Sequence, residues 1–330
     1  MDMLLAPDAA REALPTGYST SKATGHEAET RPIKLIYICG YGRSGSTLLD
    51  ILLGQQSSIF GGGEIIGLSQ HVYLNDEYCA CGERVRSCSF WRPVVEQWQA
   101  DQSSRFIQEY RRVQWKVGAV FSARRWFGGR DLDEFARHTA RLMQLMANRS
   151  GKPVIVDSSK WPGRGMALAK TKGIDLHVVH LVRDVRGVAW SLSKAYEADA
   201  AKGLQRVIVP KPLLYSAARW AYVNLAAEWL GRKVGPSKYL RLRYEDVAAD
   251  PVNGLRRIAS LAGIALDPRD FEDGEFNPAH QVAGNRLRMQ KAIRIRSDDS
   301  WQKEMPEGKQ KLLTRACGFL LARYGYPMGV

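Results

Sequence analysis

The chain has 330 residues, 45% of them hydrophobic and 25% charged, which is typical of a soluble protein with a sizeable core and not of a fibrous or low-complexity chain. Its 48 Lys and Arg residues exceed its 34 Asp and Glu residues, and the resulting net charge of +14 favours a polyanionic partner: nucleic acid, acidic membrane, acidic glycan or phosphate-rich nucleotide. The five cysteines argue against a disulfide scaffold and favour a reducing compartment, so we expect a cytoplasmic protein.

Residues 1–31 show no apolar periodicity, and they carry Asp2 and Asp8 where a signal peptide has a basic start and an apolar stretch. We therefore expect a disordered N-terminal tail followed by a single domain over residues 32–330. No apolar run in the sequence reaches the ~18 residues that are needed to span a bilayer, so no transmembrane segment is expected.

Short apolar runs alternate with stretches of helical spacing along the rest of the chain. Residues 34–39, 153–157 and 176–182 are almost continuously apolar, which predicts strands buried on both faces of a parallel sheet, and the alternating run 239–244 predicts an edge strand. Helices are predicted at 47–53, 131–148, 184–195, 213–230 and 251–262. This order indicates an α/β fold with a P-loop-like doubly wound sheet, mostly parallel and flanked by helices. About residues 75–130 interrupt the alternation and predict a helical insertion that contains cysteines and tryptophans.

The first predicted strand runs into a glycine loop, "GYGRSGSTLLD", at residues 40–50. The P-loop pattern G-x-x-x-x-G-K-[ST] matches at Gly40, Gly45 and Thr47, but Ser46 replaces the lysine. Backbone N–H groups of such a loop, together with the positive end of the following helix, suit a bound phosphate. The hydroxyls of Ser46 and Thr47 add donors, so the loop remains a candidate phosphate site without the lysine.

Cations and hydroxyls also follow the other two buried strands. Ser158, Ser159 and Lys160 follow the second, and Arg183, Arg186 and Ser191 follow the third. Ser191 lies eight positions after Arg183, close to two helical turns, so the two side chains can face the same way. Because the carboxyl ends of parallel strands meet at one edge of a sheet, these groups are expected to form one ligand site with the glycine loop.

The sequence "GRSGSTLL", combined with Arg183 and Ser191 after a later strand, resembles the sulfotransferases that use 3′-phosphoadenosine 5′-phosphosulfate (PAPS). The resemblance covers roughly residues 33–68, 152–195 and 280–301. It implies that the 5′-phosphosulfate is held by the loop, at Gly42, Arg43, Ser44, Gly45, Ser46 and Thr47. It implies that Arg183 and Ser191 hold the 3′-phosphate, that Arg288 also contacts the nucleotide, and that Ser297 helps to hold the phosphosulfate.

The arginine-serine-glycine loop is most similar to that of protein-tyrosine sulfotransferases and of bacterial glycan or natural-product sulfotransferases. That similarity implies Glu64, twenty-one residues after Arg43, as the catalytic base, with Arg43 and Lys160 stabilising the developing charge. The implied reaction moves a sulfuryl group from PAPS to a hydroxyl of a glycan, glycolipid or natural product and leaves 3′,5′-ADP. The sequence contains no convincing carboxylate cluster for Mg²⁺, so no metal is expected in this chemistry. A homodimer is compatible with this interpretation.

Other interpretations of the same residues remain open at this point. Glu64 could cap a helix that begins at Ile65, and Lys160 could be a solvated loop lysine. A small-molecule kinase would use the degenerate loop with Asp157 as its Mg²⁺ ligand, and the charge of +14 alone would suit a nucleic-acid-binding protein.

The segment "CACGERVRSCSFW" brings Cys79, Cys81 and Cys88 close together in the sequence. The three thiols could bind zinc, form a disulfide, or remain reduced structural cysteines. The C-x-C-x₆-C spacing differs from the usual C-x₂-C knuckle, and no fourth ligand is obvious, since His71 precedes the segment.

Overall fold

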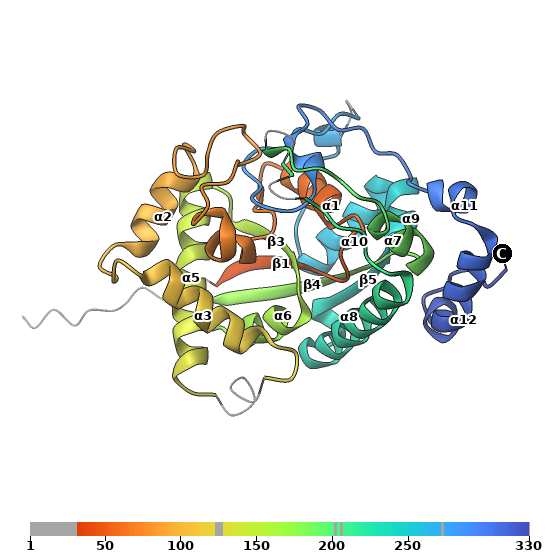
Figure 1. Ribbon diagram of the computed structural model, residues 1–330. Helices are drawn as coiled ribbons and strands as arrows, with labels where there is room; N and C mark the ends of the chain where they lie inside the picture. The colour runs from red at the N-terminus through yellow and green to blue at the C-terminus, as the bar shows by residue number, and fades with distance from the viewer. Residues whose placement is uncertain (1–31, 123–127, 201–202, 205–206, 272–273, 330) are drawn as a thin grey trace, which may run out of the picture. The chain divides into compact units, whose positions relative to one another are not determined.

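The computed structural model describes residues 32–122, 128–200, 203–204, 207–271 and 274–329 (Figure 1). The predicted N-terminal tail, residues 1–31, lies outside the described residues. In the described part of the chain, no helix combines the length and the apolar character that a bilayer crossing demands.

A parallel sheet of five strands forms the centre of the fold, in the order β2-β3-β1-β4-β5. The strands are β1 (Ile33–Cys39), β2 (Ile59–Gly61), β3 (Val154–Lys160), β4 (Ile174–Val182) and β5 (Tyr239–Arg243). β1 is central because it pairs with β3 on one side and with β4 on the other. The three predicted buried strands and the predicted edge strand, β5, are confirmed; β2 was not predicted, because it is three residues long and runs directly into glycines.

Alternate residues of the strands bury themselves under two different layers of helices. Leu35 and Tyr37 of β1 belong to a core that includes α3 (Phe106–Gly118), α5 (Arg130–Ser150), α6 (Pro162–Leu168) and α8 (Leu213–Val234). Ile36 and Ile38 belong to a second core with α1 (Ser46–Gly54) and α10 (Pro251–Ala262). Helices therefore cover both faces of the sheet, as Figure 1 shows, and the predicted doubly wound class is confirmed.

The remaining helices lie around this three-layer centre. Residues 75–130 contain α2 (Trp91–Gln99) and α3, whose apolar sides pack on α5. A third core beyond the carboxyl end of β4 joins α7 (Val185–Leu192) to α11 (Ser300–Glu304) and α12 (Glu307–Arg323). Shorter elements are η1 (Leu68–Val72), η3 (Pro236–Lys238), α9 (Tyr244–Ala249), η4 (Pro268–Phe271) and η5 (Arg286–Met289).

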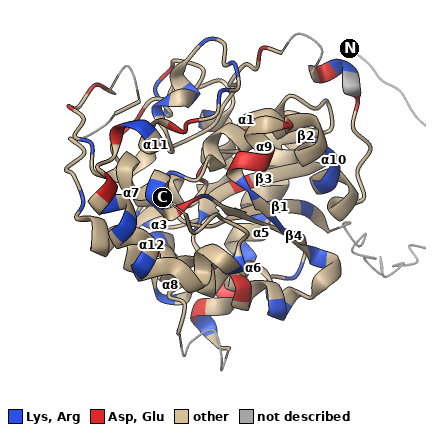
Figure 2. Cartoon of the chain, turned by 90° about the vertical axis from the view of Figure 1, so that its right-hand side faces the viewer, with Lys and Arg blue, Asp and Glu red and all other residues tan. Residues whose placement is uncertain are grey.

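Basic side chains are spread over many elements of the fold. In Figure 2, Lys and Arg appear on helices and loops throughout the view, with Asp and Glu between them. In this view, the basic residues of the described chain do not gather on one face, as they do in a groove-reading nucleic-acid-binding module. A local concentration of cations occurs instead in one pocket.

Candidate active site

The pocket lies at the carboxyl ends of the central strands, where parallel α/β sheets bind their ligands. Its volume is about 550 Å³, within the usual range for a small-molecule site. Two carboxylates, Glu64 and Asp298, face six cations: Arg43, Lys160, Arg183, Arg286, Arg294 and Arg296. The excess of cations favours a ligand with several negative charges.

The glycine loop joins β1 to α1 and brings the N-terminus of α1 to the pocket. Gly45 has a φ of 86°, and a Cβ atom there would lie 2.4 Å from Cδ2 of Tyr244, so this position requires glycine. No side chain caps α1, and its first turn contains no acidic residue. The first N–H groups of α1 are therefore available to an anion, together with the hydroxyls of Ser46 and Thr47 at the pocket wall.

The hydroxyls of Thr47 and Ser44 in the loop have different surroundings. The Thr47 hydroxyl accepts a hydrogen bond of 3.2 Å from the backbone N–H of Asn285, which ties the loop to the late segment 284–298. Ser44 is buried behind the pocket lining, and its hydroxyl has no hydrogen-bond partner among the described residues. Gly42, Arg43, Gly45, Ser46 and Thr47 line the pocket, so five of the six predicted loop residues do so and Ser44 does not.

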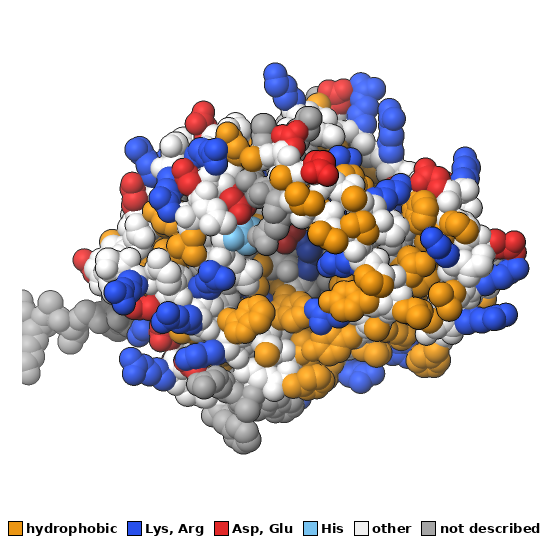
Figure 3. Space-filling model, in the orientation of Figure 1, with side chains coloured by type: hydrophobic (Ala, Val, Ile, Leu, Met, Phe, Trp, Pro, Cys, Tyr) orange, Lys and Arg blue, Asp and Glu red, His pale blue; other side chains and the backbone are white. Residues whose placement is uncertain are grey.

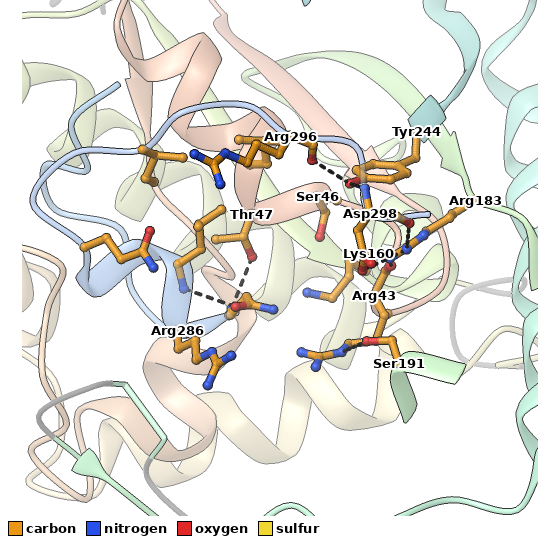
Figure 4. A pocket seen from close by; sticks show the side chains of 18 of the residues that line it. Arg43, Ser46, Thr47, Lys160, Arg183, Ser191, Tyr244, Arg286, Arg296 and Asp298 are labelled. Atoms are coloured by element: carbon orange, nitrogen blue, oxygen red, sulfur yellow. Dashed lines mark hydrogen bonds and ion pairs between the residues drawn. The ribbon is translucent and has the colours of Figure 1, made fainter. Parts of the chain in front are cut away.

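Arg43 lies beside Ser191 on one side of the pocket (Figure 4). Its Nε donates a hydrogen bond of 2.9 Å to the Ser191 hydroxyl, so one donor of the guanidinium is already engaged. Burial lowers the pKa of the Arg43 guanidinium, which nevertheless remains charged as arginines in proteins do. Its φ of 69° is rare for a residue with a side chain, and such backbone outliers concentrate at functional sites.

Arg183 stands next to Arg43, and only 5% of its surface is exposed. Its Nη1 donates to the carbonyl of Arg43 at 3.0 Å, and its Nη2 donates to the Asp298 carboxylate at 3.0 Å. Burial alone would raise the pKa of Asp298, but the hydrogen bond and the charge of Arg183 lower it overall. Arg183, Arg43 and Ser191 thus lie in one connected group. The sequence predicted that Arg183 and Ser191 would face the same way, and in the structure Arg43 links them. Arg183 at present donates to the Asp298 carboxylate.

Glu64 and Lys160 form an ion pair at the pocket. The N–H of Ile66, just before η1, donates to the hydroxyl of Ser159 at 2.9 Å and not to the Glu64 side chain, so Glu64 does not cap this turn. Lys160 has a φ of 68° at the end of β3, and its side chain is 20% exposed, so it is not a freely solvated lysine. Both side chains are therefore placed to contact a ligand.

Backbone contacts fix the position of Glu64. Its N–H donates to the carbonyl of Val282 at 2.9 Å, and the N–H of Gly63 donates to the Asp50 carboxylate at 3.0 Å. Burial raises the pKa of Asp50 to about 7. A Cβ atom on Gly63, which has a φ of 74°, would lie 2.4 Å from the Val282 carbonyl oxygen, so glycine permits this close approach.

The late segment contributes different residues from those that the resemblance implied. Arg286 lines the pocket from the side opposite Arg43 (Figure 4), together with Arg294 and Arg296. Arg288 is 1% exposed and donates to the Tyr78 carbonyl at 2.9 Å, outside the lining. Ser297 is exposed and also lies outside the lining. The implied roles of Arg288 and Ser297 gain no support from this geometry.

Sequence reasoning missed Tyr196, Tyr244 and Asp298, which also line the pocket. Tyr244 follows β5 directly, so the rule that ligands bind at strand carboxyl ends would have identified it. Nothing in the local sequence distinguishes Asp298 from its neighbour Asp299, because its partner, Arg183, comes from a distant strand.

The contrast between Arg286 and Arg288 can be measured. For 3′,5′-ADP, the product that the sequence resemblance implies, Arg286→Ala should weaken binding by roughly 10-fold or more, since a charge-assisted contact contributes ~1.5–3 kcal/mol, and should leave Tm nearly unchanged. Arg288→Ala should instead lower Tm and affect nucleotide affinity less, because it removes a buried side chain. Calorimetry and thermal denaturation on both variants test this, and the opposite pattern would restore Arg288 as the ligand contact.

The fold and the pocket together define an α/β protein with a P-loop-like, cation-lined site of nucleotide size. A model of the sulfotransferase family matches residues 36–268, and the chain belongs to that family.

Curated relatives agree with this assignment, and a solved structure is similar in fold. The chain is similar to human carbohydrate sulfotransferase 3, at 26% identity over 181 residues that cover 49% of this chain and 36% of the relative. It is also similar to mouse carbohydrate sulfotransferase 5, at 26% identity over 48% of this chain and 44% of the relative, so it spans less than half the length of either. In fold it is similar to the sulfotransferase domain from the curacin biosynthetic pathway, with a TM-score of 0.53, 16% identity, and coverage of 90% of this chain and 100% of that one.

Proposed function

We propose that this enzyme transfers the sulfuryl group of PAPS to a hydroxyl of a carbohydrate-containing acceptor and releases 3′,5′-ADP. One observation carries the proposal: a single cavity offers an uncapped helix N-terminus and, beside it, the cluster Arg43, Arg183 and Ser191. A nucleotide with anionic groups on both its 5′ and 3′ positions matches two donor groups of this kind.

We assign the 5′-phosphosulfate to the N-terminus of α1, with Ser46 and Thr47 as additional donors. The 3′-phosphate belongs with Arg183 and Ser191, where it would replace the Asp298 carboxylate as the acceptor of Arg183. Arg43 bonds to Ser191 and therefore joins the two groups. Arg286, on the other side of the cavity, supplies a further cation to the nucleotide.

Glu64 and Lys160 supply the chemistry in this proposal. The acceptor oxygen forms a bond to sulfur while the bond from sulfur to the bridging oxygen of PAPS breaks, much as in phosphoryl transfer. Glu64 takes the proton of the acceptor hydroxyl, and Lys160 and Arg43 stabilise the oxygens that gain charge. The ion pair with Lys160 holds the Glu64 carboxylate at the pocket until substrates bind.

The names of the relatives favour a sugar hydroxyl as the acceptor, within the broader choice of glycan, glycolipid or natural product. Figure 3 shows the molecule hollowed near the middle of this face, with hydrophobic side chains gathered below the hollow over α8. Exposed apolar residues there include Leu214 and Tyr215. An acceptor that has both hydroxyls and an apolar part, such as a glycolipid, fits such a border.

The kinase alternative receives less support from the geometry. Asp157, its only candidate Mg²⁺ ligand, is fully buried and accepts a hydrogen bond of 3.0 Å from Arg164 Nε. Asp157 is not one of the described residues that line the pocket. An ion-paired carboxylate behind the wall is badly placed to bind a nucleotide-bound cation.

The experiment is a transfer assay with radiolabelled PAPS against a panel of glycans, glycolipids and phenols, with ATP as a parallel donor. We expect label transfer and 3′,5′-ADP release with at least one sugar-containing acceptor, and no phosphoryl transfer from ATP. Tight binding of 5′-AMP with no preference for 3′,5′-ADP would contradict the two-anion assignment. Transfer to phenols alone would contradict the carbohydrate acceptor.

A further inference from the structure

Three cysteines of the inserted segment meet one histidine from a distant part of the chain. The ligand atoms of Cys79, Cys81, Cys88 and His280 all lie within 4.8 Å of one another. None of the four lines the pocket described above. We propose that this cluster binds one zinc ion, which has a structural role.

The separations of the four ligand atoms match a tetrahedral zinc site. Zinc lies ~2.3 Å from sulfur and ~2.0–2.1 Å from nitrogen, so tetrahedral geometry places two sulfurs roughly 3.8 Å apart and a sulfur and a nitrogen about 3.6 Å apart. The Sγ atoms of Cys81 and Cys88 are 3.7 Å apart. Nδ1 of His280 lies 3.4 Å from Sγ of Cys88 and 3.7 Å from Sγ of Cys79. These three separations agree with three of the six edges of such a tetrahedron, and the other three are no longer than 4.8 Å.

A disulfide does not explain the same arrangement. The sulfurs of a disulfide are ~2.05 Å apart, whereas the Sγ atoms of Cys81 and Cys88 are 3.7 Å apart. All five cysteines of the described chain are free thiols. Three sulfurs and one imidazole are also too soft a ligand set for Mg²⁺ or Ca²⁺, which prefer oxygen. Four protein ligands without an open position are typical of structural zinc rather than of catalytic zinc.

The cysteine segment is held in this shape by its own backbone. The N–H of Cys79 donates to the Glu83 carbonyl at 2.9 Å, and the N–H of Gly82 donates to the Cys79 carbonyl at 3.0 Å. The N–H of Cys88 donates to the Arg84 carbonyl at 2.8 Å. These bonds close a turn around the first two cysteines and bring the third back to them.

His280 is oriented toward the sulfurs by two aromatic neighbours. Its ring stacks on that of Phe90, with centroids 5.3 Å apart, and its carbonyl accepts a hydrogen bond of 2.6 Å from Trp91 Nε1. His71, the earlier histidine that the sequence offered, bonds instead to Glu77 at 2.8 Å through Nδ1. The fold therefore supplies the fourth ligand that local spacing did not reveal.

A zinc ion here would fasten the insertion to the segment that supports Glu64. The N–H of Ala80 donates to the Gln281 carbonyl at 3.1 Å, and the next residue, Val282, accepts the N–H of Glu64 at 2.9 Å. The ion would therefore add a strong cross-link two residues away from a direct contact of Glu64. Its loss should lower stability first and affect turnover only through the position of Glu64.

The test is to purify the full chain without chelator and to measure its metal content by inductively coupled plasma mass spectrometry. We expect one zinc per chain, and after replacement by Co²⁺ we expect thiolate-to-metal and tetrahedral d–d absorption. Cys81→Ser, at the exposed ligand, and His280→Gln should each weaken zinc binding at least 10-fold. Cys317→Ser and His71→Gln are matched controls outside the cluster and should retain the full zinc content.

Folded wild-type protein that remains free of zinc after dialysis against it would overturn the proposal. Unchanged zinc affinity in both ligand variants would also overturn it. A third contradicting result is a mass lower by two hydrogens in the peptides that contain these cysteines, without reductant, because it would show a disulfide. If the variants do not fold, chelation of the wild type decides: it should lower Tm and make three more thiols reactive. No change in either measurement would contradict the zinc site.

Discussion

Glu64→Gln should lower kcat by roughly 10²–10⁴-fold while leaving PAPS binding largely intact, because glutamine keeps the shape of the side chain but cannot accept the acceptor's proton. The amide can still accept a hydrogen bond from Lys160, and the backbone contact between Glu64 and Val282 does not involve the side chain. Single-turnover assays with a true acceptor and calorimetry with 3′,5′-ADP separate the two effects.

The matched control is Glu307→Gln. Glu307 is also paired with a lysine, Lys311, but the pair is exposed on α12 and should contribute little to either activity or stability. If Glu64→Gln retained more than about half of the wild-type kcat, another group would have to accept the proton. A loss of nucleotide binding equal to the loss of turnover would instead make Glu64 a structural support of the pocket.

Arg183→Ala should weaken binding of 3′,5′-ADP by about 10- to 150-fold, because a charge-assisted hydrogen bond contributes roughly 1.5–3 kcal/mol. Binding of 5′-AMP should change much less, since it lacks the 3′-phosphate. Titration calorimetry with both nucleotides measures the difference directly. Equal losses for the two would remove Arg183 from the 3′-phosphate site.

A companion variant, Asp298→Asn, tests the exchange of acceptors at Arg183. Asp298 now accepts from Arg183 at 3.0 Å and would compete with a phosphate for it. Removal of its charge should leave the affinity for 3′,5′-ADP unchanged or increase it. A fall in affinity comparable to that of Arg183→Ala would show that Asp298 orients Arg183 for the ligand rather than competing with it.

Most of the sheet could be predicted because its central strands are buried on both faces. Burial on both faces makes residues 34–39 and 176–182 almost continuously apolar, and that signal is local. The three residues of β2 are too few for any periodicity. α12 was missed because its apolar residues do not keep to one face: Leu313 and Leu321 are buried, whereas Leu312 and Phe319 are exposed.

The site residues also divide into those that local sequence predicts and those that it does not. The glycine loop, Arg183 and Ser191 follow strands at fixed spacings, so sequence reasoning reached them. The choice between Arg286 and Arg288, and the pairing of His280 with the cysteines, depend on which distant segments pack together. Such contacts leave no periodic trace in a single sequence.

The central position of β1 has a consequence for how the chain folds. Among the described strands β1 is the first to leave the ribosome, yet both of its described neighbours, β3 and β4, come after residue 153, so a hairpin with either is not available to it earlier. Closing so long a loop costs entropy before any pairing compensates for it, which makes parallel sheets of this kind slow to form. During synthesis one edge of β1 must therefore wait for the chain to reach Lys160 and the other for it to reach Val182, and in that interval the exposed strand is a natural target for chaperones.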